Sequence, residues 1–223
     1  MKKQYQNTVF LLSAIAVMAM ILIERFLSPG YWIKSLLKIL VFSLPVILVS
    51  LIYKRKIKDV LFIRKTGINR KTLLFLLLFY LLVILGYFLI KDMIDLTSIR
   101  ESLLNKEGVN EKNFYLVFSY IILVNSFLEE AFFRAFLFGS LRQRNVLFGH
   151  IVSSLLFSVY HIGIMASWFS PGIFLLFLAG LVLAGVFLNL LFERGESVFS
   201  SWIFHACANL AINTIASFMI LMI

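Results

Sequence analysis

Long apolar stretches run along the chain, separated by shorter polar connections. A helix needs about 20 consecutive apolar residues to cross the hydrocarbon core of a bilayer. The stretches that meet this requirement are 9–27, 33–53, 72–90, 114–141, 146–164, 172–192 and 198–222. The pattern therefore predicts an all-α fold: a polytopic membrane bundle of about seven transmembrane helices, with too little polar sequence left for a separate soluble domain.

The connection at residues 91–113 is polar, with few apolar positions. Such a composition predicts a surface helix and loop rather than an element of the core. We expect it to divide the chain into residues 1–113, with three membrane helices and this polar segment, and residues 114–223, with a four-helix catalytic core. The first apolar run lacks a small-residue cleavage site, so we interpret it as an uncleaved signal anchor.

Composition supports the membrane interpretation. Hydrophobic residues make up 61% of the chain, against about 45–50% in soluble domains. Eight of the 21 Lys and Arg residues lie between Lys54 and Lys71, directly between two apolar runs. This pattern is typical of a cytoplasmic loop beside anionic lipid and not of a basic face on a folded domain, so we expect the lipid bilayer and no nucleic acid among the partners. The single cysteine, Cys207, excludes a disulfide framework.

Loop charges predict how the bundle is oriented. If every run spans, the N-terminal lysines, the Lys54–Lys71 loop, Arg142 and Arg144 fall on one side. The 91–113 connection, with four basic and five acidic residues, falls on the other. The positive-inside rule then places the N-terminus in the cytoplasm and the C-terminus outside. Lys outnumbers Arg and Phe occurs 24 times, a composition that favours low-G+C coding and hence a bacterial cell membrane.

Three acidic residues, Glu24, Glu129 and Glu130, lie inside apolar stretches, whereas the other eight lie in polar connections. A charged side chain near the centre of a membrane helix costs about 3 kcal/mol on insertion scales, so it is rare without a partner or a function. The Glu24–Arg25 pair, Lys34 and Lys38 lie toward the ends of their helices. We therefore expect these four side chains to snorkel to the membrane interface.

The fourth stretch carries two adjacent acids and an arginine. Glu130 and Arg134 are four residues apart and share a helix face, with the acid in the favourable N-terminal position. Glu129 points about 100° away around the helix. Spacing therefore predicts a partner for Glu130 and leaves Glu129 unpaired and available for function. Asn125, four residues before Glu129, can extend a polar cavity on the same face.

Distance from the turns predicts that polar residues of three stretches meet at one depth. Glu129 lies 16 residues before Asn145, at the turn between the fourth and fifth stretches, and His161 lies 16 residues after it. Both are thus about 24 Å from the turn at 1.5 Å per residue. His205 and Asn209 share a face of the last stretch at a comparable depth. We predict a site formed by the fourth, fifth and seventh helices.

These groups suit two kinds of hydrolytic chemistry. A buried carboxylate such as Glu129 can act as a base on water, and His161 at the same level can help to hold that water. The His205–Asn209 pair can donate hydrogen bonds to an oxyanion. Alternatively, Glu129, His161 and His205 can ligate Zn²⁺ with an open position for water. The usual His-Glu-x-x-His zinc motif is absent, and spacing alone leaves both schemes open.

Three short motifs occur in order on separate apolar stretches: Glu129-Glu130-x-x-x-Arg134, Phe157-x-x-x-His161 and His205-x-x-x-Asn209. Together they resemble the motifs of the CPBP intramembrane proteases, which include the type II CAAX prenyl proteases and bacterial bacteriocin-processing and self-immunity proteins. The resemblance covers about residues 114–212. It implies an intramembrane endopeptidase in which Glu129 activates water with His161, while His205 and Asn209 stabilise the oxyanion.

The resemblance also has implications for the residues that surround the site and for a cofactor. It implies that Glu130 and Arg134 brace the site, in agreement with their spacing. The family is often labelled metalloprotease, although a metal-free glutamate mechanism is also argued for it. We favour the mechanism that requires no cofactor, because the fourth polar group is an amide and not a stronger ligand. Zn²⁺ bound by Glu129, His161 and His205 is the alternative.

The expected substrate is a membrane-associated peptide or protein, such as a leader, bacteriocin or signal peptide. A non-catalytic self-immunity or regulatory protein that binds a partner peptide in the same cavity is the second hypothesis. A transporter is the third, because intramembrane carboxylates and histidines also mark ion paths. The absence of an internal repeat weakens the third hypothesis. Nothing in the sequence indicates an oligomeric state.

Overall fold

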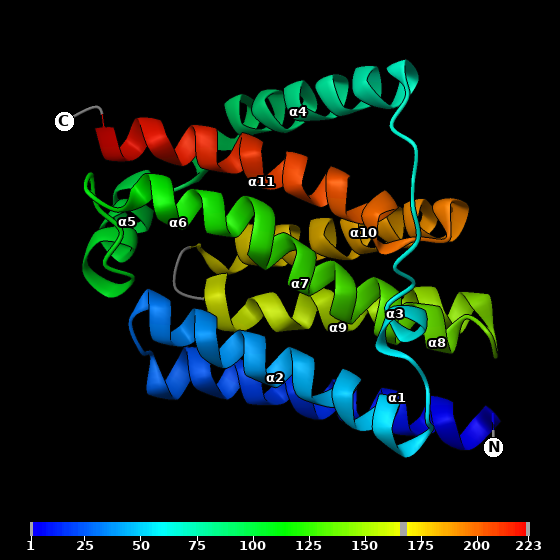
Figure 1. The fold of residues 1–223 in the computed structure, drawn as a ribbon. Coiled ribbons are helices and arrows are strands. Elements are labelled where there is room, and N and C mark those ends of the chain that lie inside the picture. Colours follow the sequence, from blue (N-terminus) through cyan, green and yellow to red (C-terminus); the bar gives the residue numbers. More distant parts are fainter. Residues whose placement is uncertain (1, 166–168, 222–223) are drawn as a thin grey trace.

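The computed structural model describes residues 2–165 and 169–221, and Figure 1 shows them as long helices lying side by side. Within these residues all regular secondary structure is helical. The elements are α1 (Lys2–Leu22), η1 (Ile23–Leu27), α2 (Tyr31–Ile52), α3 (Ile57–Val60), α4 (Arg70–Ile90), η2 (Lys91–Met93), α5 (Leu96–Glu101), η3 (Ser102–Lys106), α6 (Phe114–Tyr120), η4 (Ile121–Asn125), α7 (Ser126–Glu130), η5 (Ala131–Phe138), α8 (Gly139–Leu141), α9 (Val146–Met165), α10 (Pro171–Gly195) and α11 (Val198–Leu221).

The described part of the chain contains seven helical spans long and apolar enough to cross a membrane. They are Lys3–Leu27, Tyr31–Ile52, Arg70–Met93, Phe114–Leu141, Val146–Gly163, Pro171–Gly195 and Val198–Phe218. The predicted all-α bundle is confirmed, and the chain is an integral multi-pass membrane protein. The first span begins six residues before its predicted start at position 9, because its polar residues pack on α8. Tyr5 Oη lies 3.1 Å from Ser140 Oγ, and Gln6 Nε2 donates to Ser140 O at 3.3 Å.

The spans form an ordered stack (Figure 1). The antiparallel pair α1 and α2 covers one side of the fourth span and α9, and α10 and α11 lie on the other side. Helix α4 lies at the edge, where it packs on α11, and none of its residues is buried. Tyr80 Oη donates to Thr214 Oγ1 at 3.1 Å across this contact. The edge helix therefore presents most of its surface outward.

The two ends of the bundle differ in charge. The N-terminus, the basic 53–69 loop and the α8–α9 turn lie at one end, and the 91–113 connection lies at the other (Figure 1). The basic loop is fastened to the α10–α11 turn, since Ser197 Oγ donates to Arg64 O at 2.7 Å. The connection forms the short helices α5 and η3, as predicted. Its Val109 enters an apolar cluster with residues of α6 and α11.

Aromatic side chains fill the core around the fourth span. Phe42 of α2 stacks on Phe132 at 4.3 Å, and Phe133 meets Tyr160 of α9 at 5.8 Å between ring centroids. Two π-helical segments, η4 and η5, flank the single α-helical turn α7 that carries the adjacent acids. Such wide turns are frequent at functional sites. The fold thus places the acids on a short turn held by packed aromatic rings.

Candidate active site

Glu129 lies at the centre of the polar residues, with 2% of its surface exposed. Its Oε1 accepts a hydrogen bond from Lys38 Nζ at 2.5 Å and one from Asn125 Nδ2 at 3.0 Å. The prediction that Glu129 is unpaired is therefore wrong. Its partner comes from α2, 91 residues earlier in the chain. Spacing within one helix cannot reveal a contact between helices.

The expectation that Lys34 and Lys38 snorkel is also wrong, because they are only 8% and 6% exposed. Lys38 Nζ donates to the amide oxygen of Asn125 as well as to Glu129, and it lies over the Tyr160 ring at 4.8 Å. A buried ammonium that finds such partners does not need to reach the interface.

Lys34, one turn away on α2, joins a separate ion cluster. Its Nζ lies 3.0 Å from Glu24 Oε2 and 2.6 Å from Glu107 Oε2. Glu24 is buried as well, so the snorkelling expectation fails for Glu24, Lys34 and Lys38, whereas Arg25 is exposed. We call Glu24, Lys34 and Glu107 the end cluster, because Glu107 belongs to the 91–113 connection. This cluster ties η1 and α2 to that connection.

Glu130 contacts the one group expected beside it, Arg134, and one more, His205. Arg134 Nη1 lies 3.1 Å from Glu130 Oε1, which confirms the predicted pair, and both side chains are fully buried. The same oxygen lies 2.8 Å from His205 Nδ1. Since a carboxylate paired with arginine accepts hydrogen bonds, Nδ1 is the donor. The sequence did not predict this contact, which fixes the ring orientation of His205.

The other side of the His205 ring faces Glu129. The distance from His205 Nε2 to Glu129 Oε2 is 3.7 Å, too long for a direct hydrogen bond. One water molecule at about 2.8 Å from each atom fits such a separation. Glu129 Oε2 makes no hydrogen bond with any described residue that would compete for this position. Glu129 Oε2 and His205 Nε2 are thus spaced so that one water molecule can bridge them.

His161 joins this layer from α9. Its Nδ1 lies 2.7 Å from Phe157 O, and because a carbonyl only accepts, Nδ1 donates and Nε2 of the neutral ring is an acceptor. The Phe157 ring lies 4.7 Å from the His161 ring and 5.9 Å from the His205 ring. The Arg134 guanidinium covers the same Phe157 ring at 4.1 Å. Phe157 is therefore a packing residue that separates the two histidines.

Asn209 lies on the same helix as His205 but makes a different contact. Its Nδ2 donates to Ile121 O at 3.3 Å, about two turns before Glu129. One turn further, Asn213 Nδ2 donates to Phe118 O at 3.4 Å. These two amides fasten α11 to the fourth span, where no water competes for backbone carbonyls. Asn209 thus contacts the fourth span about two turns from Glu129 and has a second N–H beside the one bound to Ile121 O.

A metal centre can be tested against this arrangement. No group of three or more His, Cys, Asp or Glu side chains is spaced to hold a metal ion in the ranges 2–165 and 169–221. The Lys38 ammonium, 2.5 Å from Glu129 Oε1, also opposes a divalent cation on the same carboxylate. The set formed by Glu129, His161 and His205 does not fit zinc as it stands.

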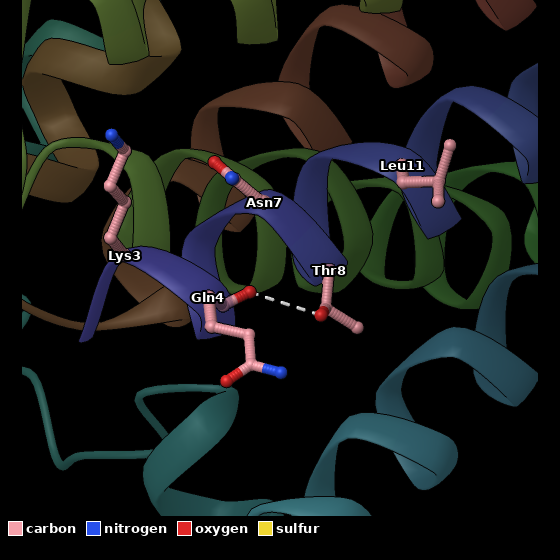
Figure 2. Close-up of a pocket in the computed structure, with 5 residues that line it drawn as sticks. All are labelled: Lys3, Gln4, Asn7, Thr8 and Leu11. Atoms are coloured by element: carbon pink, nitrogen blue, oxygen red, sulfur yellow. Dashed lines mark hydrogen bonds between the residues drawn. The ribbon is translucent and has the colours of Figure 1, made fainter. Parts of the chain in front are cut away.

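A surface pocket on the first turns of α1 offers a contrast (Figure 2). It is lined by Lys3, Gln4, Asn7, Thr8 and Leu11. One of its polar groups is occupied locally, since Thr8 Oγ1 donates to Gln4 O at 3.0 Å. The pocket contains no carboxylate and no imidazole. The buried layer around Glu129 is therefore the better candidate for an active site.

Comparison with known proteins supports this choice. Residues 111–211 match a family model described as type II CAAX prenyl endopeptidase Rce1-like. The matched region runs from the turn before α6 into α11, so it includes all three motifs. No curated protein matches the chain significantly. The match supports the resemblance of the motifs to this family, over just under half of the chain.

Proposed function

Because residues 111–211 match the model of the Rce1-like type II CAAX prenyl endopeptidase family, we propose that the protein is an intramembrane endopeptidase with Glu129 as its catalytic base. It hydrolyses a peptide bond in a membrane-associated peptide or protein. One observation carries the proposal: Glu129 Oε2 faces His205 Nε2 at 3.7 Å in a buried site. Lys38 binds the other oxygen of Glu129, and Glu130 binds the other ring nitrogen of His205. A reacting water fits between them.

The first step is attack of this water on the scissile carbonyl. Glu129 Oε2 accepts a proton as the water oxygen bonds to the carbonyl carbon, and His161 Nε2 orients the water as a second acceptor. His205 acts as an imidazolium whose Nδ1 is bound to Glu130 and whose Nε2–H donates to the oxyanion. The free N–H of Asn209 supplies a second donor to that oxyanion.

The second step is collapse of the tetrahedral intermediate. The C–N bond breaks and the proton held by Glu129 passes to the leaving amine, which restores the carboxylate. Glu130 and Arg134 do not touch the substrate in this scheme, and they keep His205 oriented. Every proton is carried by a residue of the chain or by the water, so no cofactor is required.

We place the N-terminus and the basic loop in the cytoplasm of a bacterial cell, since both lie at the strongly basic end of the bundle. Substrates in this proposal are leader, bacteriocin or signal peptides in the same membrane. The chain's long exposed apolar surface keeps the enzyme and such peptides in one plane, which raises their effective concentration.

The test is comparative peptidomics of membranes that contain the active protein or its Glu129→Gln variant. We expect peptides that appear only with the active protein, because loss of a general base lowers the rate by about 10²- to 10⁴-fold. Glu24→Gln is the matched control, a buried carboxylate bound to a lysine outside the site. It should cleave normally.

Unchanged cleavage by a folded Glu129→Gln protein would reject the proposed base. A different outcome would support the regulatory alternative: protection against a bacteriocin that persists in both the Glu129→Gln and His161→Ala variants. In that case the cavity binds a peptide without hydrolysing it.

A further inference from the structure

The second span supplies a group to a site that otherwise belongs to the C-terminal half of the chain. Lys38 lies outside the family-matched residues 111–211, yet its ammonium touches Glu129. We propose that Lys38 is a positioning residue of the peptidase, which holds Glu129 Oε1 and so keeps Oε2 apart from His205. This inference rests on the proposed function, since it assigns a role within the same reaction.

The geometry around Lys38 leaves its ammonium little freedom. It donates to Glu129 and Asn125, and the Tyr160 ring covers it at 4.8 Å. Asn125 in turn donates to the same oxygen of Glu129. Glu129 Oε1 thus accepts two hydrogen bonds from groups that also bond each other. Such a closed triangle fixes the carboxylate rotamer and leaves Oε2 as its reactive oxygen.

Charges explain why this positioning matters for hydrolysis. Glu130 already has Arg134 as its cation, so without Lys38 the basic groups left beside Glu129 are the two imidazoles, and the His205 ring is the one that faces Glu129 Oε2 at 3.7 Å. An imidazolium and a carboxylate in an apolar interior attract strongly, and a direct contact closes to about 2.8 Å. Closure from 3.7 Å would remove the place of the water. Lys38 gives Glu129 its own counterion and leaves His205 available for the oxyanion.

Lys34 provides a matched control on the same helix. It lies one turn from Lys38, is similarly buried and also pairs with carboxylates, but these are Glu24 and Glu107 of the end cluster. Loss of either ammonium therefore removes a buried ion pair from α2. Only the loss of Lys38 should change the reaction itself.

The kinetic test uses the full chain in detergent or nanodiscs and a quenched fluorescent peptide that spans a cleavage site found by the membrane peptidomics. Lys38→Met and Lys38→Gln should lower kcat at least tenfold, with KM within about twofold, because the substrate does not touch Lys38. Lys38→Arg, which keeps a cation, should recover most of kcat. Lys34→Met should keep kcat within twofold per folded protein, as measured by size-exclusion chromatography.

A second test reads the site without any substrate. The chain has three histidines, so ¹⁵N-histidine labels only His150, His161 and His205, and single His→Gln variants assign the signals. In Lys38→Met the Nε2 proton of His205 should move downfield, as expected when it bonds directly to Glu129. The spectrum of Lys34→Met should match that of the unaltered protein.

The proposal is overturned if folded Lys38→Met keeps both kcat and the His205 spectrum, or if Lys34→Met reproduces its losses. The proposed function fails by a different result, namely full cleavage by Glu129→Gln. A shifted His205 signal in Lys38→Met would still establish the positioning contact in that case, because the spectra do not depend on turnover.

Discussion

Lys34 and Lys38 lie one helical turn apart on α2, and each belongs to a buried ion cluster. The two clusters differ in how the carboxylate oxygens are used. In the end cluster Lys34 pairs with Glu24 and Glu107, and it joins three segments that meet at one end of the bundle. In the candidate active site Lys38 pairs with one oxygen of Glu129 and leaves the other oxygen toward His205. The same residue type, at nearly the same burial, thus joins segments of the fold in one place and, in the proposed reaction, positions the base in the other.

The difference shows how a reactive site can be told from a structural one in a membrane interior. Burial and charge do not separate the two clusters, since both contain buried carboxylates. Unused hydrogen-bonding capacity does, because Glu129 Oε2 and His205 Nε2 face each other at 3.7 Å with room for a third group. Variants that remove one cation from each cluster test this distinction.

The largest effect is expected from Arg134→Met. The variant leaves Glu130 fully buried with its guanidinium partner gone, which should lower the free energy of unfolding by about 3–5 kcal/mol. Hydrolysis should fall as well, because Glu130 no longer holds His205 in a fixed orientation. Denaturant titration in detergent measures the first effect and peptide cleavage the second.

Arg64→Met is the control for this prediction. Its pair with Glu196 at 2.8 Å joins side chains that are more than half exposed, so its loss should change stability by about 0–1 kcal/mol. Equal stability losses in the two arginine variants would contradict the assignment of Arg134 to the buried brace.

The next effect concerns the amides on α11. Asn209→Leu should lower kcat by about 10²- to 10³-fold, as expected for an oxyanion donor. Asn213→Leu loses a similar hydrogen bond to a backbone carbonyl of the fourth span but lies one turn further away. It should keep kcat, and each variant should lose about 0.5–1.5 kcal/mol of stability. Equal kcat values for both variants would assign Asn209 to bracing alone.

The smallest effect on the reaction is expected in the end cluster. Lys34→Met leaves Glu24 and Glu107 without their ammonium near the edge of the membrane, which should cost about 1.5–3 kcal/mol of stability. Thermal unfolding followed by light scattering measures this loss. A drop in kcat beyond twofold for folded protein would erase the distinction between the two clusters.

Patterns within single helices predicted the fold well. Apolar run lengths located the spans because the bilayer imposes one length on all of them. The Glu130–Arg134 pair also followed from spacing, since residues four apart on a helix must be neighbours. The depth argument brought His205 to the level of the adjacent acids, which it contacts or faces, because rise per residue is nearly constant.

These patterns could not predict contacts between helices that are far apart in the sequence. Lys38 was expected at the membrane interface because it lies near a helix end. That position does not reveal which side chains of the neighbouring span lie beside it. The His205–Glu130 contact depends on the rotation of α11 about its axis, which hydrogen bonds to backbone carbonyls of the fourth span set. One sequence contains no signal for such rotations.

The wide turn η4 decides which residue stands opposite Lys38. A π turn accommodates one residue more than an α turn without rotating the helix beyond it. If the same residues wound as an uninterrupted α-helix from α6, everything after position 125 would be turned by about 100°. Leu128 would then stand where Glu129 stands, and a lysine would face a hydrocarbon side chain. The choice between an inert bundle and a hydrolase thus lies in the winding of five residues, Ile121–Asn125.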